Sequence, residues 1–176
     1  MSYVFCLPTW GAPFISAVVS GKDDNLKVLQ KVVGGAIERV ANNSFVIHPL
    51  FCEEEKRWKI LSEIVKSKTV KVYVNEDGYN QGLCANMATI TRGIGGCPHF
   101  LGDVCVVVPQ KVLAVLKINP DAFTLIMPVR EIEEGEYPVW EFEDDKEEKE
   151  QKKKWASKYP QYDYKECGGY CYKSKV

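Results

Sequence analysis

The stretch that decides the fold is Thr69-Val70-Lys71-Val72-Tyr73-Val74-Asn75-Glu76-Asp77-Gly78. Its three valines alternate with Thr, Lys and Tyr, so its first half predicts a strand with one apolar face. The next residues, Asn75 to Gly78, predict a turn, because Asn and Asp tolerate left-handed backbone angles and Gly takes a positive φ freely. The strand therefore ends in a turn that presents the carboxylate of Glu76. Glu76 and the later Asn86 either brace this turn or contribute to a ligand or partner site.

Two amphipathic helices are predicted before this strand. The first has apolar residues at helical spacing and ends at a glycine pair, which satisfies the last carbonyls without a Cβ clash. The second begins with three Glu residues and ends with Lys residues, as the helix dipole favours. The apolar stripes are Leu26, Leu29, Val32 and Val33 in the first helix, and Trp58, Leu61, Ile64 and Val65 in the second.

Short apolar runs predict the remaining elements. Tyr3–Leu7 and Phe14–Val19 are expected to be strands, and Val104–Val108 has the continuous apolar character of a strand buried on both faces. Residues 36–40 and 45–49 flank a polar loop of four residues, which predicts a β-hairpin. Residues 86–92 are expected to form a short helix with Asn86 as its cap. Residues 112–118 and 123–127 are two further strands, or one of them is helical.

The fold class that follows is α+β, with a small mixed or antiparallel sheet and two or three helices. The compact domain is expected to span residues 1–128. From residue 129 the composition changes to acidic residues followed by lysines, and acids stand four residues before bases, so residues 129–176 predict an exposed charged helix and an extended tail rich in Tyr and Lys.

Composition limits the function classes. The 176 residues are 45% hydrophobic and 27% charged, which is ordinary for a globular protein, and the net charge of -1 argues against a strongly basic nucleic-acid binder. Seven cysteines cannot all pair within one chain, and no secretory signal is visible, so we expect reduced thiols and no secretion. No apolar run approaches the roughly 20 residues of a membrane helix.

Three motifs in order resemble the family described as domain of unknown function 3846, over roughly residues 25–110. The motifs are Gly34 to Val40, then Val74 to Gly78 with Asn86, Ala88 and Thr89, then Leu101 to Val107. The resemblance implies an α+β fold and a viral or mobile-element origin, since the family occurs in phages, large DNA viruses, bacteria and some eukaryotes. It supplies no catalytic residue. The motif residues that it singles out are Asn75, Glu76, Gly78, Asn86, Gly102 and Asp103.

Catalytic and metal chemistry find little support in the sequence. Cys97-Pro98-His99 brings a thiol and an imidazole together, but a dyad requires two side chains that point at one another, and neighbours in sequence rarely do. The spacing of Cys84, Cys97, His99 and Cys105 does not match a zinc knuckle. Cys97/His99 and Cys167/Cys171 are each half a site, which leaves a zinc joined from the two halves, an intermolecular or local disulfide between Cys167 and Cys171, or plain thiols. The glycines at 93, 95 and 96 lack the context of a phosphate loop. We expect no enzymatic activity, no cofactor and no metal.

The aromatic residues of the C-terminal region are the expected partner contacts, because Tyr and Trp are enriched at protein interfaces. They are Trp140, Trp155, Tyr159, Tyr162, Tyr164, Tyr170 and Tyr172. The function expected is that of a non-enzymatic structural protein that docks into a larger assembly of protein subunits, such as a minor capsid or virion component of a large DNA virus. The alternative is a regulatory or anti-defence module in the host-cell cytoplasm that binds nucleic acid or a host protein.

Overall fold

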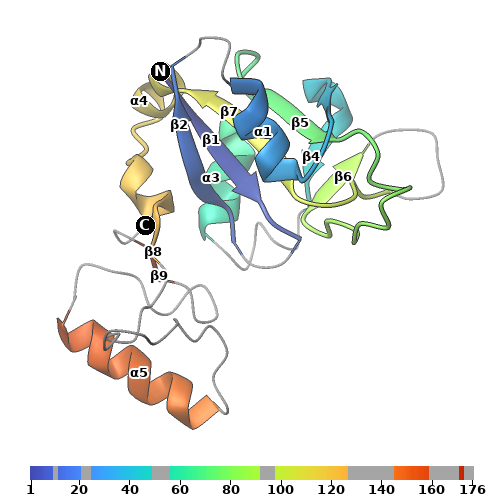
Figure 1. Ribbon diagram of the computed structural model, residues 1–176. Coiled ribbons are helices and arrows are strands. Elements are labelled where there is room, and N and C mark those ends of the chain that lie inside the picture. Colours follow the sequence, from blue (N-terminus) through green and yellow to red (C-terminus); the bar gives the residue numbers. More distant parts are fainter. Residues whose placement is uncertain are drawn as a thin grey trace. The chain divides into compact units, whose positions relative to one another are not determined.

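The computed structural model describes residues 1–9, 12–20, 25–48, 56–91, 98–126, 145–158 and 171–172. It has the predicted α+β fold, in which a five-stranded antiparallel sheet and two two-stranded sheets combine with helices (Figure 1). The chain divides into two compact units, residues 1–120 and 121–176, which are described separately.

The five-stranded sheet forms the centre of the first unit and has the strand order β2-β1-β7-β5-β3. Every neighbouring pair is antiparallel. The central strand β7 buries Val104, Cys105, Val106 and Val108, which confirms the prediction of a strand covered on both faces. The bounds are β1 Ser2–Leu7, β2 Phe14–Val19, β3 Ile37–Val40, β5 Lys71–Asn75 and β7 Val104–Pro109.

Helix α1 (Asn25–Val33) lies on one face of this sheet and confirms the first predicted helix (Figure 1). Its residues Leu29 and Val33 pack against Val4 and Cys105 of the sheet. The helix ends at Gly34, whose φ of 78° requires a residue without a Cβ clash. The amides of Gly34 and Gly35 both donate to the carbonyl of Gln30, at 2.8 and 3.0 Å.

Helix α3 (Lys56–Ile64) confirms the second predicted helix and lies behind the sheet in the view of Figure 1. Its face Trp58, Leu61 and Ile64 is buried. The three Glu residues expected to begin it lie outside the described residues.

The predicted hairpin between residues 36–40 and 45–49 is wrong, although both segments contain strands. Strand β3 pairs with β5, whereas β4 (Phe45–Ile47) pairs with β6 (Thr89–Thr91) in the separate two-stranded sheet. Between them, residues Asn42–Ser44 form a single 3-10 turn. The side-chain amide of Asn42 donates to the carbonyls of Ser67 and Val70, at 3.1 and 3.0 Å, and so ties the loop to the start of β5.

The predicted short helix at 86–92 is also wrong. Asn86 begins a turn in which the amide of Thr89 donates to its carbonyl at 3.1 Å, and β6 follows at once. Thr89, Ile90 and Thr91 are β-branched, and the free side of β4 offers them a strand to pair with. Tertiary pairing therefore overrides the apparent helical pattern.

After β7 the chain forms α4 (Gln110–Val115), so the helical alternative holds for the first of the two segments after Pro109. A 3-10 turn, η2 (Pro120–Phe123), follows. The second unit contains β8 (Leu125–Ile126), the predicted charged helix α5 (Asp145–Lys158), and β9 (Cys171–Tyr172). Strand β9 pairs antiparallel with β8, so a part of the tail for which no regular structure was expected forms a strand.

Candidate binding cleft at the edge of the sheet

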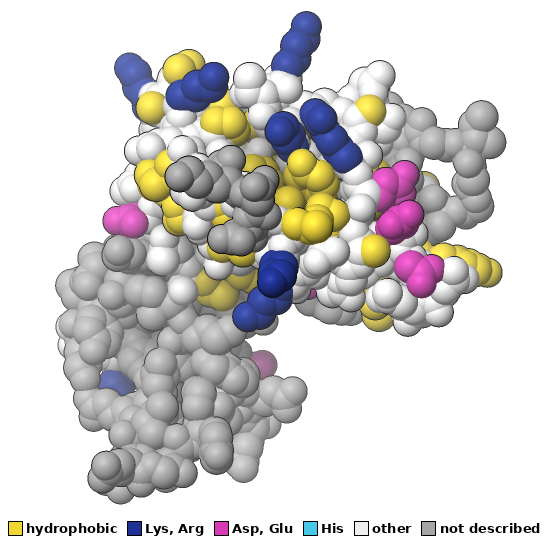
Figure 2. Space-filling view, turned by 45° about the horizontal axis from the view of Figure 1, so that its top comes forward, with side chains coloured by type: hydrophobic (Ala, Val, Ile, Leu, Met, Phe, Trp, Pro, Cys, Tyr) yellow, Lys and Arg dark blue, Asp and Glu magenta, His cyan; other side chains and the backbone are white. Residues whose placement is uncertain are grey.

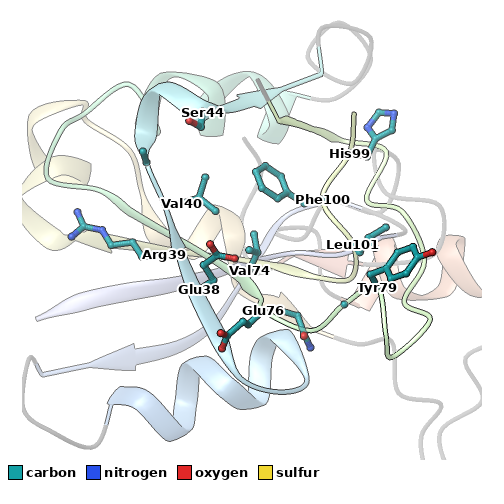
Figure 3. A pocket seen from close by; sticks show the side chains of 13 residues that line it. Glu38, Arg39, Val40, Ser44, Val74, Glu76, Tyr79, His99, Phe100 and Leu101 are labelled. Atoms are coloured by element: carbon teal, nitrogen blue, oxygen red, sulfur yellow. The ribbon is translucent and has the colours of Figure 1, made fainter. Parts of the chain in front are cut away.

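A cleft of about 420 Å³ lies in the first unit where β3 and the end of β5 meet the turn after β5 and the segment 99–101. Figure 3 shows Arg39, Glu38 and Val40 on the strand side, with Phe100, Leu101 and Tyr79 on the loop side. Arg39 points away from the centre of the cleft in this view, whereas Glu38 and Val40 point toward it.

The floor of the cleft follows from the register of β3 and β5. Glu38 lies opposite Val74, and the amide of Glu76 donates to the carbonyl of Ala36 at 2.8 Å, which extends the pairing by one residue pair. Alternate residues of a strand share a face, so Glu38, Val40, Val74 and Glu76 lie on one side of the sheet. Glu38 and Glu76 are diagonal neighbours across the two strands, and such residues are separated by roughly 7–8 Å. Two exposed carboxylates therefore stand beside an apolar strip of two valines.

Asn75 fixes the start of the turn that carries Glu76. Its side-chain amide is buried and donates to the carbonyl of Val33 at 3.1 Å and to Gln81 Oε1 at 3.2 Å. Its Oδ1 accepts from the amide of Asp77 at 2.8 Å, as in an Asx turn. A Cβ on Gly35 would lie 2.9 Å from Asn75 Nδ2, so the glycine leaves room for this side chain. Asn75 thus joins the end of α1 to the turn.

Two further glycines allow the loop side of the cleft to approach the turn closely. A Cβ on Gly78 would lie 3.0 Å from Leu101 Cβ, and a Cβ on Gly102 would lie 2.7 Å from Leu83 Cδ1. Gly102 also has a φ of 82°, which a side chain would strain. The leucines on either side pack directly against backbone, and this contact positions Leu101 in the cleft.

Asn86 connects the loop side of the cleft to the interior of the fold. It is fully buried, and its Nδ2 donates to the carbonyl of Leu7 at 2.8 Å and to that of Gly102 at 3.1 Å. Its backbone amide donates to the carbonyl of Phe100 at 2.7 Å. Its Oδ1 is buried and has no hydrogen-bond partner within the described residues. Asn86 is therefore a connector between the end of β1 and the loop side of the cleft, not the helix cap that the sequence predicted.

The motif residues divide into two groups in the structure. Asn75, Glu76 and Gly78 line the cleft, and Gly102 lies directly behind it. Asp103 does not line the cleft; it lies at the C-terminal end of β1, where its Oδ1 accepts from the amide of Thr9 at 3.0 Å, so it anchors the loop after β1. Of the two roles that the sequence left open for Glu76 and Asn86, Asn86 forms bracing hydrogen bonds together with Asn75, whereas the carboxylate of Glu76 is exposed.

The sequence did not single out the other cleft residues as members of a binding site, although two of the motifs contain some of them and His99 was weighed for catalysis and zinc. Glu38 was missed because the hairpin prediction placed β3 beside β4, far from Glu76. His99 also lines the cleft; its Nδ1 is 2.7 Å from the carbonyl of Thr89, and its ring is centred 6.3 Å from that of His48. Tyr79, at the rim, is 86% exposed, and nothing in its local sequence distinguished it from an ordinary turn residue.

The aromatic residues expected to contact partners lie largely outside the described structure. Trp155 falls in α5 and Tyr172 in β9, but their side chains are not described. The others lie outside the described residues: Trp140, Tyr159, Tyr162, Tyr164 and Tyr170. The same is true of Cys97, Cys167 and the glycines at 93, 95 and 96.

The described thiols are poorly suited to nucleophilic chemistry. Cys6 and Cys105 lie opposite one another on β1 and β7 and are buried. Burial raises the pKa of the Cys6 thiol far above its usual range, with further contributions from Asp103 and Cys105, and burial raises the pKa of Cys105 to about 12. Both remain protonated near neutral pH, and the protonated thiol is not the reactive form. The third, Cys84, is exposed.

The described residues form neither a metal cluster nor a membrane-spanning helix. In these ranges no three His, Cys, Asp or Glu side chains come together as a metal site would require. None of the helices described has the length and apolar character needed to cross a membrane.

Comparison of the chain with protein-family models, with curated proteins and with solved structures gave no match. The resemblance to the family of unknown function therefore stays a prediction that rests on its three motifs.

Proposed function

We propose that this protein is a non-enzymatic interaction protein that docks into a larger assembly, and that the edge of β3 is one of its docking surfaces. The observation that carries the proposal is the position of β3. Among the described strands, β3 lies at one edge of the five-stranded sheet and has β5 as its single neighbour. An edge strand offers unpaired backbone groups to which another chain can add as a further strand.

The hydrogen-bond pattern identifies those backbone groups. The bond from Glu76 to Ala36 makes Ala36, and with it Glu38 and Val40, members of hydrogen-bonded pairs with β5. The intervening residues Ile37 and Arg39 belong to non-hydrogen-bonded pairs with β5. Their amide and carbonyl groups therefore point outward from the free edge of β3. An added strand would bond to these two residues.

The C-terminal aromatic residues remain a second proposed contact region, and the role of virion component rests on the family resemblance alone. A partner chain that engages both surfaces would gain avidity, because the second contact forms at a high effective concentration.

The test is quantitative cross-linking of the tagged full chain in its source cells, with two substitutions at one residue. Arg39→Pro removes an outward-facing amide and leaves the bonds to β5, because proline is tolerated where a strand's N–H faces solvent. Arg39→Thr removes the guanidinium and keeps that amide. We expect the proline variant to lose partners that the threonine variant retains, and truncation after Pro128 to lose others. If neither change alters the partner set, the proposal is wrong.

A second candidate function, contact with nucleic acid, is favoured by the charge of one surface. Lys and Arg outnumber Asp and Glu in residues 1–120, whereas the reverse holds in 121–176. Figure 2 shows a face on which Lys and Arg side chains lie above and below an apolar patch, with Asp and Glu side chains to its right. Lys27 and Lys31 of α1 are among the exposed cations. Binding to a single-stranded oligonucleotide that weakens steeply between 50 and 200 mM salt supports this function, and the absence of such binding at low salt excludes it.

A further inference from the structure

Strand β3 carries opposite charges on its two sides. Glu38 faces the cleft together with Glu76, and neither carboxylate forms an ion pair within the described residues. Arg39 projects from the other side of the strand, and with Lys68 it lines a second cleft of about 530 Å³. Lys71 lies on the same side as Arg39, because it is two residues from Tyr73, the partner of Arg39. The edge therefore has an acidic side and a basic side.

The acidic cleft fits one kind of side chain. Val40 and Val74, which are 8% and 6% exposed, form a mostly buried apolar strip at its floor, and the exposed carboxylates of Glu38 and Glu76 lie on the same side of the sheet. Lys and Arg combine an aliphatic stem with a cationic head, so they can cover the strip and still reach the carboxylates. On the basic side, the cationic groups of Arg39 and Lys68 favour a carboxylate by charge complementarity.

A second copy of the chain fits this edge poorly. If two β3 strands paired antiparallel about Glu38, the two Glu38 carboxylates would lie directly opposite on one face. If the pairing were centred on Arg39, the two guanidinium groups would lie opposite. Like charges directly opposite are destabilising in a sheet, and charged edge residues are a common means of preventing self-association.

We propose that the occupant of this edge is an extended segment of a partner protein in which a Lys or Arg stands next to an Asp or Glu. Successive residues of a strand point to opposite faces, so adjacent charges of opposite sign place the cation in the acidic cleft and the carboxylate over Arg39. This inference rests on the proposed function, since it specifies the segment that the docking edge selects.

The probes are synthetic peptides added to the ¹⁵N-labelled full chain and followed by NMR. The first, Thr-Val-Thr-Lys-Glu-Thr-Val-Thr, places its two charges on opposite faces. The second, Thr-Val-Lys-Thr-Glu-Val-Thr-Thr, has the same composition and places both charges on one face. We expect the first to shift the amide signals of Ile37 and Arg39 at lower peptide concentration, by about two- to fivefold in apparent Kd, because one exposed charge pair contributes weakly to binding and the second peptide loses one such pair.

Charge reversal tests which groups select the peptide. The Glu38→Lys/Glu76→Lys variant should lose the preference for the first peptide and bind Thr-Val-Thr-Glu-Glu-Thr-Val-Thr more tightly than the wild-type chain does. Glu63→Lys, which changes an exposed carboxylate on α3 outside the cleft, is the matched control and should leave the preference intact. Unchanged far-UV circular dichroism shows that each variant is folded.

The outcomes separate this inference from the proposed function. If both peptides of equal composition shift Ile37 and Arg39 equally, the edge accepts strands without regard to charge order, so the charge inference is wrong and edge docking stands. If no peptide shifts these amides at millimolar concentration, the inference is overturned. The proposed function is then judged by the two Arg39 variants in cells, which do not depend on peptide charge.

Discussion

Replacement of Asn86 by alanine should destabilise the fold strongly, because this side chain joins two elements that are distant in sequence. Its Nδ2 bonds to Leu7 and Gly102 at 2.8 and 3.1 Å in a fully buried position. A typical hydrogen bond contributes about 1 kcal/mol, and a buried group left unpaired costs about 1–3 kcal/mol. Loss of two bonds should therefore lower the free energy of unfolding by about 2–4 kcal/mol.

The assay is urea denaturation of the full chain followed by far-UV circular dichroism. Asn80→Ala is the control, because Asn80 is exposed and, within the described residues, its side chain bonds only to the exposed Asp77 in the same turn. We expect the control to change the free energy of unfolding by less than about 0.5 kcal/mol, as is usual for surface substitutions. A loss below about 1 kcal/mol in Asn86→Ala would refute the reasoning, since it would mean that the two carbonyls find other donors.

The Asn86→Asp variant adds a pH dependence whose sign follows from the same contacts. An ionised carboxylate at this position would face two carbonyl oxygens in a buried site, so the pKa of the new carboxyl should rise above the reference of about 3.9. Below about pH 4 both the folded and the unfolded chain hold the proton. As the pH rises toward the folded-state pKa, only the unfolded chain loses it, and stability falls by about 1.4 kcal/mol per pH unit. The wild-type chain should lack this extra slope.

Two further predictions concern the glycines and the thiols. Gly102→Ala should lower the free energy of unfolding by at least about 1 kcal/mol more than Gly82→Ala, because both have positive φ but only at Gly102 would the new Cβ meet a side chain, at 2.7 Å; equal losses in urea denaturation would contradict this. A maleimide at pH 8 should label Cys84 within minutes, whereas Cys6 and Cys105 should react only after unfolding, as mass spectrometry of proteolytic fragments can show; rapid labelling of either in the folded chain would contradict their burial.

The sequence predicted the positions of helices and strands better than it predicted which strands pair with one another. The alternation in residues 69–74 and the helical spacing before Gly34 report which face of each element is buried, and both elements form as expected. Strand pairing depends on contacts between distant segments. The polar loop at 41–44 has the length of a hairpin loop, yet Asn42 bonds to the segment before β5 and directs β4 into another sheet.

The cleft was only partly predictable for the same reason, because it depends on which strands pair. Glu76 could be identified because it directly follows a strand in a recognisable turn. Glu38 could not, because its place beside Glu76 depends on the pairing of β3 with β5. The role of Asn86 was equally hidden, since a buried amide that bonds to backbone 79 and 16 residues away leaves no local pattern.

The place of β1 in the sheet has a consequence for how the protein folds during its synthesis. Strand β1 pairs with β2 on one side and with β7 on the other, so its second partner emerges from the ribosome about a hundred residues later. At 5–20 residues per second this interval lasts roughly 5 to 20 seconds. During that time the second edge of β1 presents its backbone groups without the strand that pairs with them. The nascent chain should therefore depend on chaperones, and its folding should be completed late, when β7 inserts between β1 and β5.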